Sequence, residues 1–408
     1  MPEINKNNDR FANIFYKSII IILVILAFLS FVSSGYLDED FFLKKSQDKE
    51  LHSDTIQKIY IFQKILLIAE TFFVFLILIF LHFNKKICNC IDKNKLLFQN
   101  LLLLIGTILV FIFIGEIIAR ITLSNDSVGG DFGPGSIKFN LNIPRNQDGM
   151  RDRDFTIIKP ENTIRIAAIG DSFTYGWGIE NSNNVYPKVL EKKLNNISNI
   201  NYEVLNFGLP DSNTEDELLI IKEKALKYNP DIIILGYYIN DLENIDSNNI
   251  EENFYIEMPY IGFILRNSFY LYYFFETRSN YLIERFILKD PYSKIIQKRF
   301  ESEINKNHSE TIFKELKAIS KKNKMPVLIV SFPAIYKLDD YYLLNANEFI
   351  NEIADENDFY FVDMFDIYKN YDENELIVSI YDRHPSEFGH ELAADAILNE
   401  LKEKKLSD

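Results

Sequence analysis

Long apolar runs fill the first third of the chain, and short ones are spread along the rest. The long runs are at residues 18–37, 65–83 and about 96–118. The first carries no charged residue, and the second contains a single acid, Glu70. A helix of this length can cross the hydrocarbon core of a bilayer. The pattern therefore predicts a membrane region at 1–123 with three transmembrane helices.

The first run has an alternative interpretation as a cleaved signal peptide. Basic residues precede it, and Ser33, Ser34 and Gly35 are small. Two further apolar runs follow, however, and no cleavage site of the A-x-A kind is evident. Both observations favour a membrane anchor.

Basic residues predict the orientation of these helices. They are Lys6, Arg10 and Lys17 in the amino-terminal tail and Lys85, Lys86, Lys93 and Lys95 after the second run. Cytoplasmic loops collect Lys and Arg, although the first loop also holds Lys44, Lys45 and Lys49. We therefore expect a multi-pass protein of the cell (inner) membrane whose carboxy-terminal domain lies on the extracytoplasmic side.

A different pattern begins after the membrane region. Residues 124–146 are rich in Gly, Asn, Ser and Pro, which is typical of a linker. The domain at 147–408 then contains short apolar runs rich in β-branched residues. These runs are residues 163–170, 202–208, 231–237, 326–332 and 359–365. Strands this apolar are covered on both faces, so the sheet is expected to be parallel.

Segments with helical periodicity separate these strands, at 186–194, 214–228 and 309–322. This alternation predicts an α/β fold with three layers, in which helices cover both faces of a doubly wound parallel sheet of five strands. A last helix is expected to begin near Ser386 and to bury its apolar side, formed by Phe388, Leu392, Ala396 and Ile397. Ligands of such sheets lie outside the carboxyl ends of the strands.

An aromatic-rich segment at 245–305 interrupts the alternation. Extra helices packed on the domain are the favoured interpretation; a lid or a membrane-facing surface is the alternative.

Composition narrows the possible partners. The net charge of −15 argues against a nucleic-acid partner. The two cysteines, Cys88 and Cys90, lie in the loop predicted to be cytoplasmic, so the exported domain would contain no disulfide. No cluster of metal-ligating residues is visible in the sequence, and we expect neither a metal nor another cofactor.

Three predicted strands end in residues suited to acyl transfer. The first ends in Gly170, Asp171 and Ser172, the second ends in Gly208, and the third ends in a segment that contains Asn240. A serine hydroxyl can attack a carbonyl carbon. The backbone N–H groups of Ser172 and Gly208 and the side-chain amide of Asn240 could then stabilise the oxyanion.

A serine nucleophile needs a base, and histidine is the usual one. His52 and His82 belong to the membrane region, and His308 lies in a polar helical stretch. His384 is therefore the expected base, in a loop after the fifth strand. His390 falls within the last helix and is expected to be structural.

Together these segments resemble the SGNH (GDSL-type) hydrolase superfamily. The matching blocks are "IGDSFTYGWG" with Ser172, "NFGLPDSNT" with Gly208, "YINDL" with Asn240 and "DRHPSEFGH" with His384. The resemblance extends from about Gly149 to the last helix, and "DGMRDRDF" at 148–155 is similar to the lead-in of membrane-anchored members. It implies the flavodoxin-like fold of that superfamily and a Ser172-acyl intermediate.

The sequence departs from this pattern at two points. Tyr238 stands where the third block usually has glycine, and Tyr381 stands where the last block usually has aspartate. Asp382, only two residues before His384, is the expected orienting acid, with a backbone carbonyl as the alternative. Asp171 is interpreted as a structural cap of the turn.

The resemblance implies a membrane-anchored serine esterase. By analogy with its expected location, we favour an O-acyl ester, with acetyl as the acyl group, of a cell-envelope carbohydrate or lipid. One alternative is an O-acetyltransferase that takes its acyl group from a membrane donor. The other is an inactive binding or assembly protein on the same fold.

Overall fold

A computed structural model describes residues 95–123, 145–242, 270–283, 291–380 and 382–406. The predicted helices at 18–37 and 65–83, with Glu70, Cys88 and Cys90, lie outside these residues, as does most of the linker. The chain divides into two compact units, Met1–Ile118 and Ala119–Asp408.

Helix α5 (Lys95–Leu123) confirms that the third apolar run is helical. A search of the described residues finds no helix with the combination of length and apolarity that a membrane span needs.

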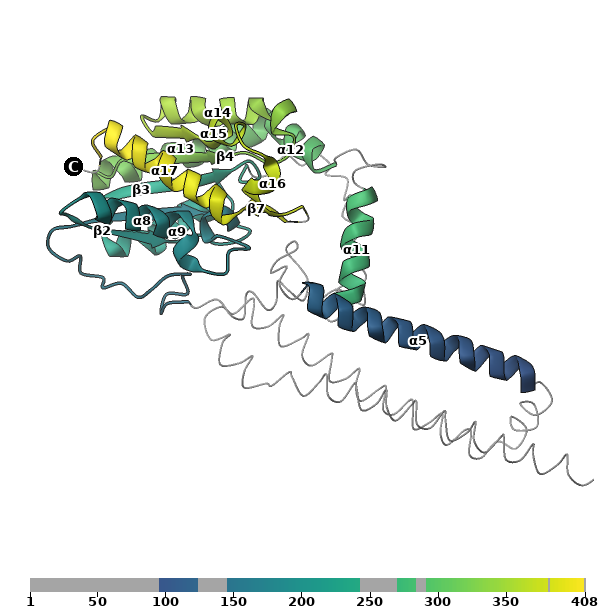
Figure 1. The fold of residues 1–408 in the computed structure, drawn as a ribbon. Coiled ribbons are helices and arrows are strands. Elements are labelled where there is room, and N and C mark those ends of the chain that lie inside the picture. Colours follow the sequence, from purple (N-terminus) through teal and green to yellow (C-terminus); the bar gives the residue numbers. More distant parts are fainter. Residues whose placement is uncertain (1–94, 124–144, 243–269, 284–290, 381, 407–408) are drawn as a thin grey trace, which may run out of the picture. The chain divides into compact units, whose positions relative to one another are not determined.

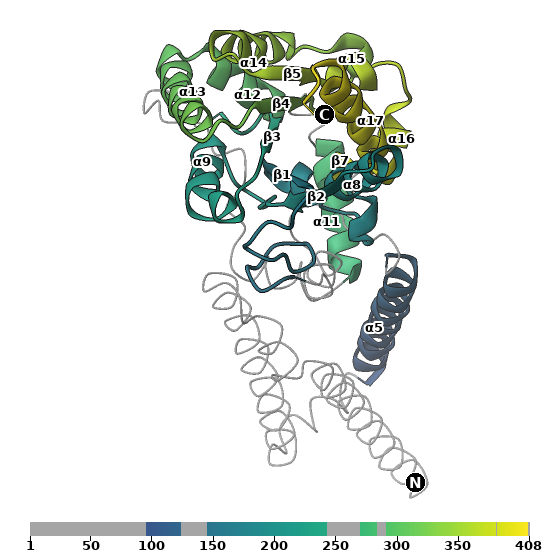
Figure 2. The same ribbon diagram turned by 90° about the vertical axis from the view of Figure 1, so that its left-hand side faces the viewer.

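Five parallel strands form the sheet of the second unit. They are β1 (Thr163–Gly170), β2 (Asn201–Asn206), β3 (Ile232–Tyr238), β4 (Val327–Phe332) and β5 (Tyr360–Asp363). Their order is β2-β1-β3-β4-β5, and every neighbouring pair is parallel. Figure 2 shows the strands following one another in this order. The predicted five-stranded parallel sheet is therefore confirmed.

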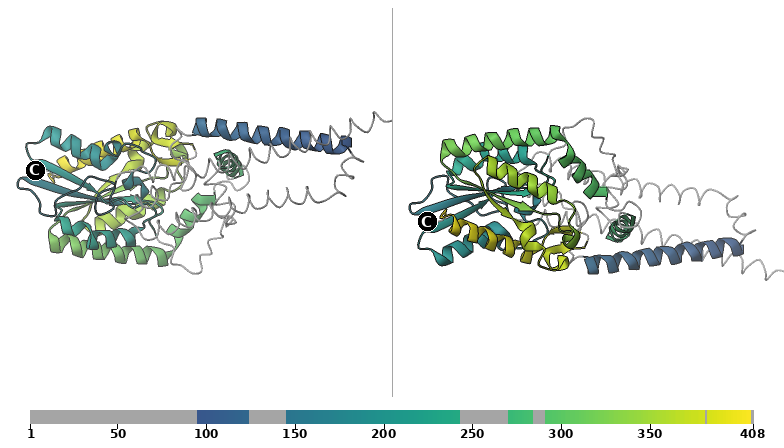
Figure 3. Two further views of the ribbon diagram at one scale, coloured as in Figure 1. Left: turned by 90° about the horizontal axis from the view of Figure 1, so that it is seen from below. Right: turned by 90° about the horizontal axis from the view of Figure 1, so that it is seen from above.

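Helices cover both faces of this sheet (Figures 1 and 3). The longer ones are α8 (Tyr186–Ile197), α9 (Thr214–Glu223), α12 (Pro291–Glu301), α13 (Glu303–Asn323), α14 (Leu344–Glu356) and α17 (Glu387–Glu403). Helix α8 packs beside α17, and α9 packs beside α13. Because both faces are covered, strand residues such as Ile166, Ile234 and Val330 are fully buried.

Shorter elements complete the unit. They are the helices α7 (Ser172–Tyr175), α15 (Met364–Tyr368) and α16 (Glu373–Leu376), three 3-10 turns at Ser182–Asn184, Ala225–Tyr228 and Leu338–Asp340, and the strands β6 (Ile377–Ser379) and β7 (Asp382–Pro385). Strands β6 and β7 form a separate antiparallel pair. A loop was expected at the position of β7, because runs of three or four residues are too short to show a periodic pattern.

The described part of the 245–305 segment is helical. It contains α11 (Tyr270–Ile283), α12 and the first residues of α13. Ile296 and Phe300 of α12 are each 1% exposed and belong to the main core of the unit. This part of the segment is an added helix packed on the domain, as expected.

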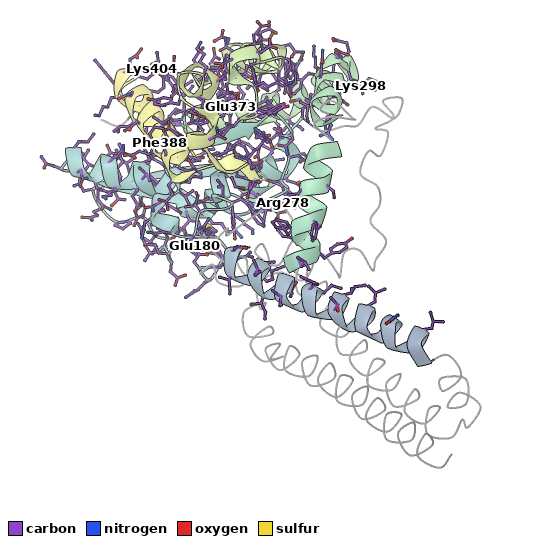
Figure 4. All side chains as sticks on the ribbon, turned by 45° about the vertical axis from the view of Figure 1, so that its right-hand side comes forward. Glu180, Arg278, Lys298, Glu373, Phe388 and Lys404 are labelled. Atoms are coloured by element: carbon purple, nitrogen blue, oxygen red, sulfur yellow. The ribbon has the colours of Figure 1, made fainter. Side chains whose placement is uncertain are left out.

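Helix α17 begins after its N-cap Ser386, as predicted, but its buried face differs from the predicted one. Phe388, labelled in Figure 4, was expected to point inward and is 37% exposed. Its ring lies edge-on to that of Tyr371, with 5.3 Å between the centroids. Ile397 is buried as predicted, Leu392 and Ala396 are only partly buried, and the buried side also contains His390 and Ala394. The reason is that the small residues Gly389, Ala393 and Ala394 allow close approach to neighbouring elements, which a count of large apolar residues ignores.

His390 is fully buried, as expected for a structural residue. Its Nδ1 accepts a hydrogen bond from the backbone N–H of Tyr186 at 3.3 Å. Burial lowers the pKa of His390 from 6.5 to about 3, and the positive charges of Arg151 and His384 add to this effect. The unfolded chain therefore binds a proton between these pH values that the folded protein does not.

We expect His390→Asn to weaken the pH dependence of stability, since the asparagine oxygen can accept the Tyr186 bond but does not titrate. From this group the wild type should lose about 1.4 kcal/mol of unfolding free energy per unit as the pH falls from 6.5 toward 3. Urea unfolding at several pH values measures the slope. His308→Asn is the control on the surface of α13. An unchanged slope in His390→Asn would contradict the assignment.

Candidate active site

The turn after β1 presents Ser172. Gly170 has a φ of +156°, and a side chain there would overlap Thr174 and the backbone of Gly236. The Asp171 carboxylate then accepts a hydrogen bond from the Phe173 N–H at 2.8 Å and caps helix α7, as predicted. Ser172, the first residue of that helix, is therefore held at the carboxyl end of β1 and is only partly buried.

Strand β7 brings a histidine and an aspartate to this serine. His384 Nε2 lies 2.8 Å from Ser172 Oγ, and His384 Nδ1 lies 2.5 Å from Asp382 Oδ1. The side chain of Asp382 is 1% exposed and that of His384 is 15% exposed. The structure thus joins Ser172, His384 and Asp382 in one hydrogen-bonded chain, in the arrangement of a serine hydrolase triad.

The short spacing of Asp382 and His384 follows from the extended backbone of β7. Residues two apart on a strand point to the same side. The pairing of β7 with β6 maintains this conformation, and the Asp382 N–H donates to Ser379 Oγ at 3.1 Å. An aspartate two residues before the histidine can therefore reach the imidazole, and no backbone carbonyl has to replace it.

Aromatic rings surround the histidine. The Phe173 ring lies 5.4 Å from the His384 ring between centroids, and the Trp177 ring lies 6.3 Å from it. Tyr238, at the position where the resemblance leads one to expect glycine, stacks on Phe173 at 4.2 Å. The departure at Tyr238 thus adds a ring to the wall of the site.

A tight turn after β3 presents Asn240. The Tyr238 N–H donates to Asp241 Oδ2 at 2.6 Å, and the Asp241 N–H donates to the Tyr238 carbonyl at 2.9 Å. Asn240 is partly buried between these two residues, and its side-chain oxygen has no hydrogen-bond partner within the described residues. The side chain is held by its backbone turn at the same edge of the sheet as Ser172.

The backbone N–H of Gly208, expected to be an oxyanion donor, already has a hydrogen-bond partner. It donates to Asn206 Oδ1 at 2.9 Å and is buried. A side chain at 208 would overlap the backbone of Thr174 and Tyr175. The glycine is needed for the close approach of this loop to helix α7, and its predicted role as an oxyanion donor lacks support here.

Arg151 holds the backbone next to the site, a role that was not predicted from the sequence. Its buried guanidinium donates to the backbone carbonyls of Tyr175, Gly176, Ile179 and Glu180. Burial lowers its pKa to about 10. Arg151 therefore fixes the chain directly after helix α7, and the "DGMRDRDF" segment was the available signal for it.

Asp171 carries a second carboxylate close to the reacting atoms. Its Oδ2 lies 3.3 Å from Ser172 Oγ, and the residue is 2% exposed. Burial raises the pKa of this carboxyl to about 6, although the hydrogen bond from Phe173 N–H and the charge of His384 act in the opposite direction.

The fold and the Ser172–His384–Asp382 geometry are those of a serine hydrolase. A comparison with family models matches the GDSL-like Lipase/Acylhydrolase family over residues 168–392, more than half of the chain. The chain belongs to this family. The protein is accordingly a serine hydrolase that acts on ester bonds.

The solved structures that match this chain share little sequence identity with it. An acetyl xylan esterase is 16% identical, covering 58% of this chain and 98% of its own, with a TM-score of 0.36. A lipase/acylhydrolase from Enterococcus faecalis is 17% identical, covering 59% and 96%, with a TM-score of 0.37. An acetylxylan esterase from Geobacillus stearothermophilus is 16% identical, covering 60% and 96%, with a TM-score of 0.38. The comparison with curated proteins found no match.

We expect Gly208→Ala to destabilise the protein by about 3 kcal/mol or more, because the added methyl group meets backbone atoms that cannot move aside cheaply. Denaturant unfolding measures the loss. Leu209→Ala is the control, since it changes the same loop without adding an atom. Wild-type stability in Gly208→Ala would show that the loop and helix α7 are not in contact as described.

Proposed function

We propose that the protein is a membrane-anchored serine esterase that hydrolyses an O-acyl ester, with acetyl as the acyl group, of a cell-envelope carbohydrate or lipid. The observation that carries the proposal is the hydrogen bond of 2.8 Å between His384 Nε2 and Ser172 Oγ. It pairs a nucleophile with a base in a geometry suited to proton transfer.

The proposed reaction begins with attack of Ser172 Oγ on the ester carbonyl carbon. His384 Nε2 takes the hydroxyl proton as the new carbon–oxygen bond forms. The Asp382 carboxylate accepts the Nδ1–H bond and stabilises the imidazolium. The ester bond then breaks, and the imidazolium gives its proton to the leaving alcohol. Water, which gives a proton to the same imidazole, then attacks the carbonyl carbon of the acyl-serine. The bond to Ser172 Oγ breaks, the carboxylic acid leaves, and the imidazolium returns its proton to Ser172 Oγ.

Two donors are proposed for the oxyanion. One is the backbone N–H of Ser172, and the other is the side-chain amide of Asn240, whose turn directs it to the same sheet edge. Gly208 is left out of this set because its N–H is bonded to Asn206. Each preorganised donor of this kind typically contributes about 10²- to 10³-fold in rate.

A small acyl group is supported by the aromatic side chains near the triad. Phe173 and Trp177 flank the His384 ring, and Tyr238 stacks on Phe173. We propose that rings at these positions would narrow the site beside the reacting carbonyl, which would favour acetyl over long acyl chains.

Membrane attachment and an extracytoplasmic active site are supported by the sequence alone. The uncharged run at 18–37 and the nearly uncharged run at 65–83 have the length of a membrane span. The basic residues that flank them favour export of the carboxy-terminal domain. Cell-envelope glycans and lipids would then be the nearest ester-bearing substrates.

We expect Ser172→Ala and His384→Ala to lower p-nitrophenyl acetate hydrolysis by about 10⁴-fold or more, because each removes one member of the nucleophile–base pair. Asp382→Asn should lower kcat by about 10⁴-fold through the wrong imidazole tautomer. Ser182→Ala and His308→Ala, remote from the triad, are matched controls. Undiminished hydrolysis in Ser172→Ala would contradict the assignment of the nucleophile.

An acetylated glycan supplied to the wild-type protein separates hydrolysis from transfer. Hydrolysis releases free acetate without any acceptor. Acetate that appears only on an added glycan acceptor, with none released to water, would contradict the esterase and identify a transferase.

A further inference from the structure

Ser172 Oγ lies between two possible acceptors of its proton. His384 Nε2 is 2.8 Å away and Asp171 Oδ2 is 3.3 Å away. The hydroxyl has one hydrogen, and the shorter contact gives it to the imidazole. The carboxylate of Asp171 therefore remains next to the nucleophile as a negatively charged group, and it accepts a hydrogen bond from the Phe173 N–H.

The same carboxylate is close to the imidazole. Both groups contact Ser172 Oγ, so Asp171 Oδ2 and His384 Nε2 cannot be more than about 6 Å apart. Asp171 is 2% exposed, so little water screens this interaction. A negative charge at this distance stabilises the imidazolium that forms when Ser172 loses its proton.

We propose that Asp171 is a second carboxylate of the serine–histidine pair, which stabilises the His384 imidazolium in addition to capping helix α7. Asp382 acts on the Nδ1 side of the ring, and Asp171 acts on the Nε2 side. This inference rests on the proposed function, because it assumes that His384 takes the Ser172 proton.

Asp171 is ionised at neutral pH despite its burial, so the interaction is available there. Protonation of Asp171 below about pH 6 weakens it, and the His384 charge acts to lower the pKa of Asp171. The other ionisable groups that act on this region are Asp382, Tyr186, Glu217, His390 and Arg151. A substitution at 171 leaves these side chains in place, although the Asp171 charge is one of the causes that raise the pKa of Tyr186.

A matched control is present at the other end of the sheet. Asp363 ends β5, and its Oδ1 accepts the Phe365 N–H at 2.8 Å, so it caps helix α15 as Asp171 caps α7. Both are partly or fully buried carboxylates that begin a short helix after a strand. Asp363 is hydrogen-bonded to Asn347 instead of to a serine of the triad.

The test measures the rate of fluorophosphonate labelling of the full-length protein against pH. In Asp171→Asn the amide oxygen still caps Phe173, but the charge is gone. We expect the pH of half-maximal labelling to move down by on the order of one unit and the plateau rate to fall several-fold. Asp363→Asn should keep the wild-type profile. If folded Asp171→Asn protein keeps the wild-type pH profile, the inference is contradicted, and Asp171 only caps helix α7.

A second measurement separates this inference from the proposed function. The His384 titration is followed by NMR with labelled histidine, and His384→Gln assigns the signal. We expect the midpoint in Asp171→Asn to lie on the order of one unit below that of the wild type, whether or not the protein turns over an ester. An unmoved midpoint would overturn the inference, whereas absence of labelling in the wild type would contradict only the proposed function.

Discussion

The hydrogen bond between Ser172 and His384 is the contact on which the rest of the site depends. It joins residues 212 positions apart in the sequence, one at the end of β1 and one on β7. The backbone around each side chain sets its position. The neighbouring elements must therefore maintain the distance between Ser172 Oγ and His384 Nε2. Asp171 and Gly170 shape the turn that carries the serine, Arg151 fixes the chain after it, and pairing with β6 keeps β7 extended.

The cost of this arrangement is the burial of charge. Asp382 is 2% exposed, and its Oδ1 accepts both the His384 backbone N–H at 3.1 Å and the imidazole Nδ1 contact at 2.5 Å. A buried carboxylate needs such partners, because an unpaired one would be strongly destabilising. The low dielectric that makes the burial costly also strengthens the attraction to the imidazolium. The electrostatic stabilisation by the buried Asp382 carboxylate therefore acts on the imidazole ring of His384.

Much of the fold could be predicted from the sequence because buried parallel strands are uniformly apolar. The run 163–170 coincides with β1, and each of the other four predicted runs overlaps one of the strands β2 to β5. Strand β7 could not be predicted, since four residues are too few to show a periodicity. Without this strand, the sequence could not explain why Asp382 reaches His384. Sequence spacing also could not show that the Gly208 N–H is bonded to Asn206, because that depends on side-chain geometry within one loop.

The central claim is that Ser172 is the nucleophile made reactive by His384. Its most direct test is to treat the full-length protein with a fluorophosphonate and to locate the adduct by peptide mass spectrometry. We predict a single phosphonylated peptide carrying the adduct on Ser172, and its disappearance in His384→Ala. An adduct on another serine, or equal labelling of Ser172 without His384, would contradict the account.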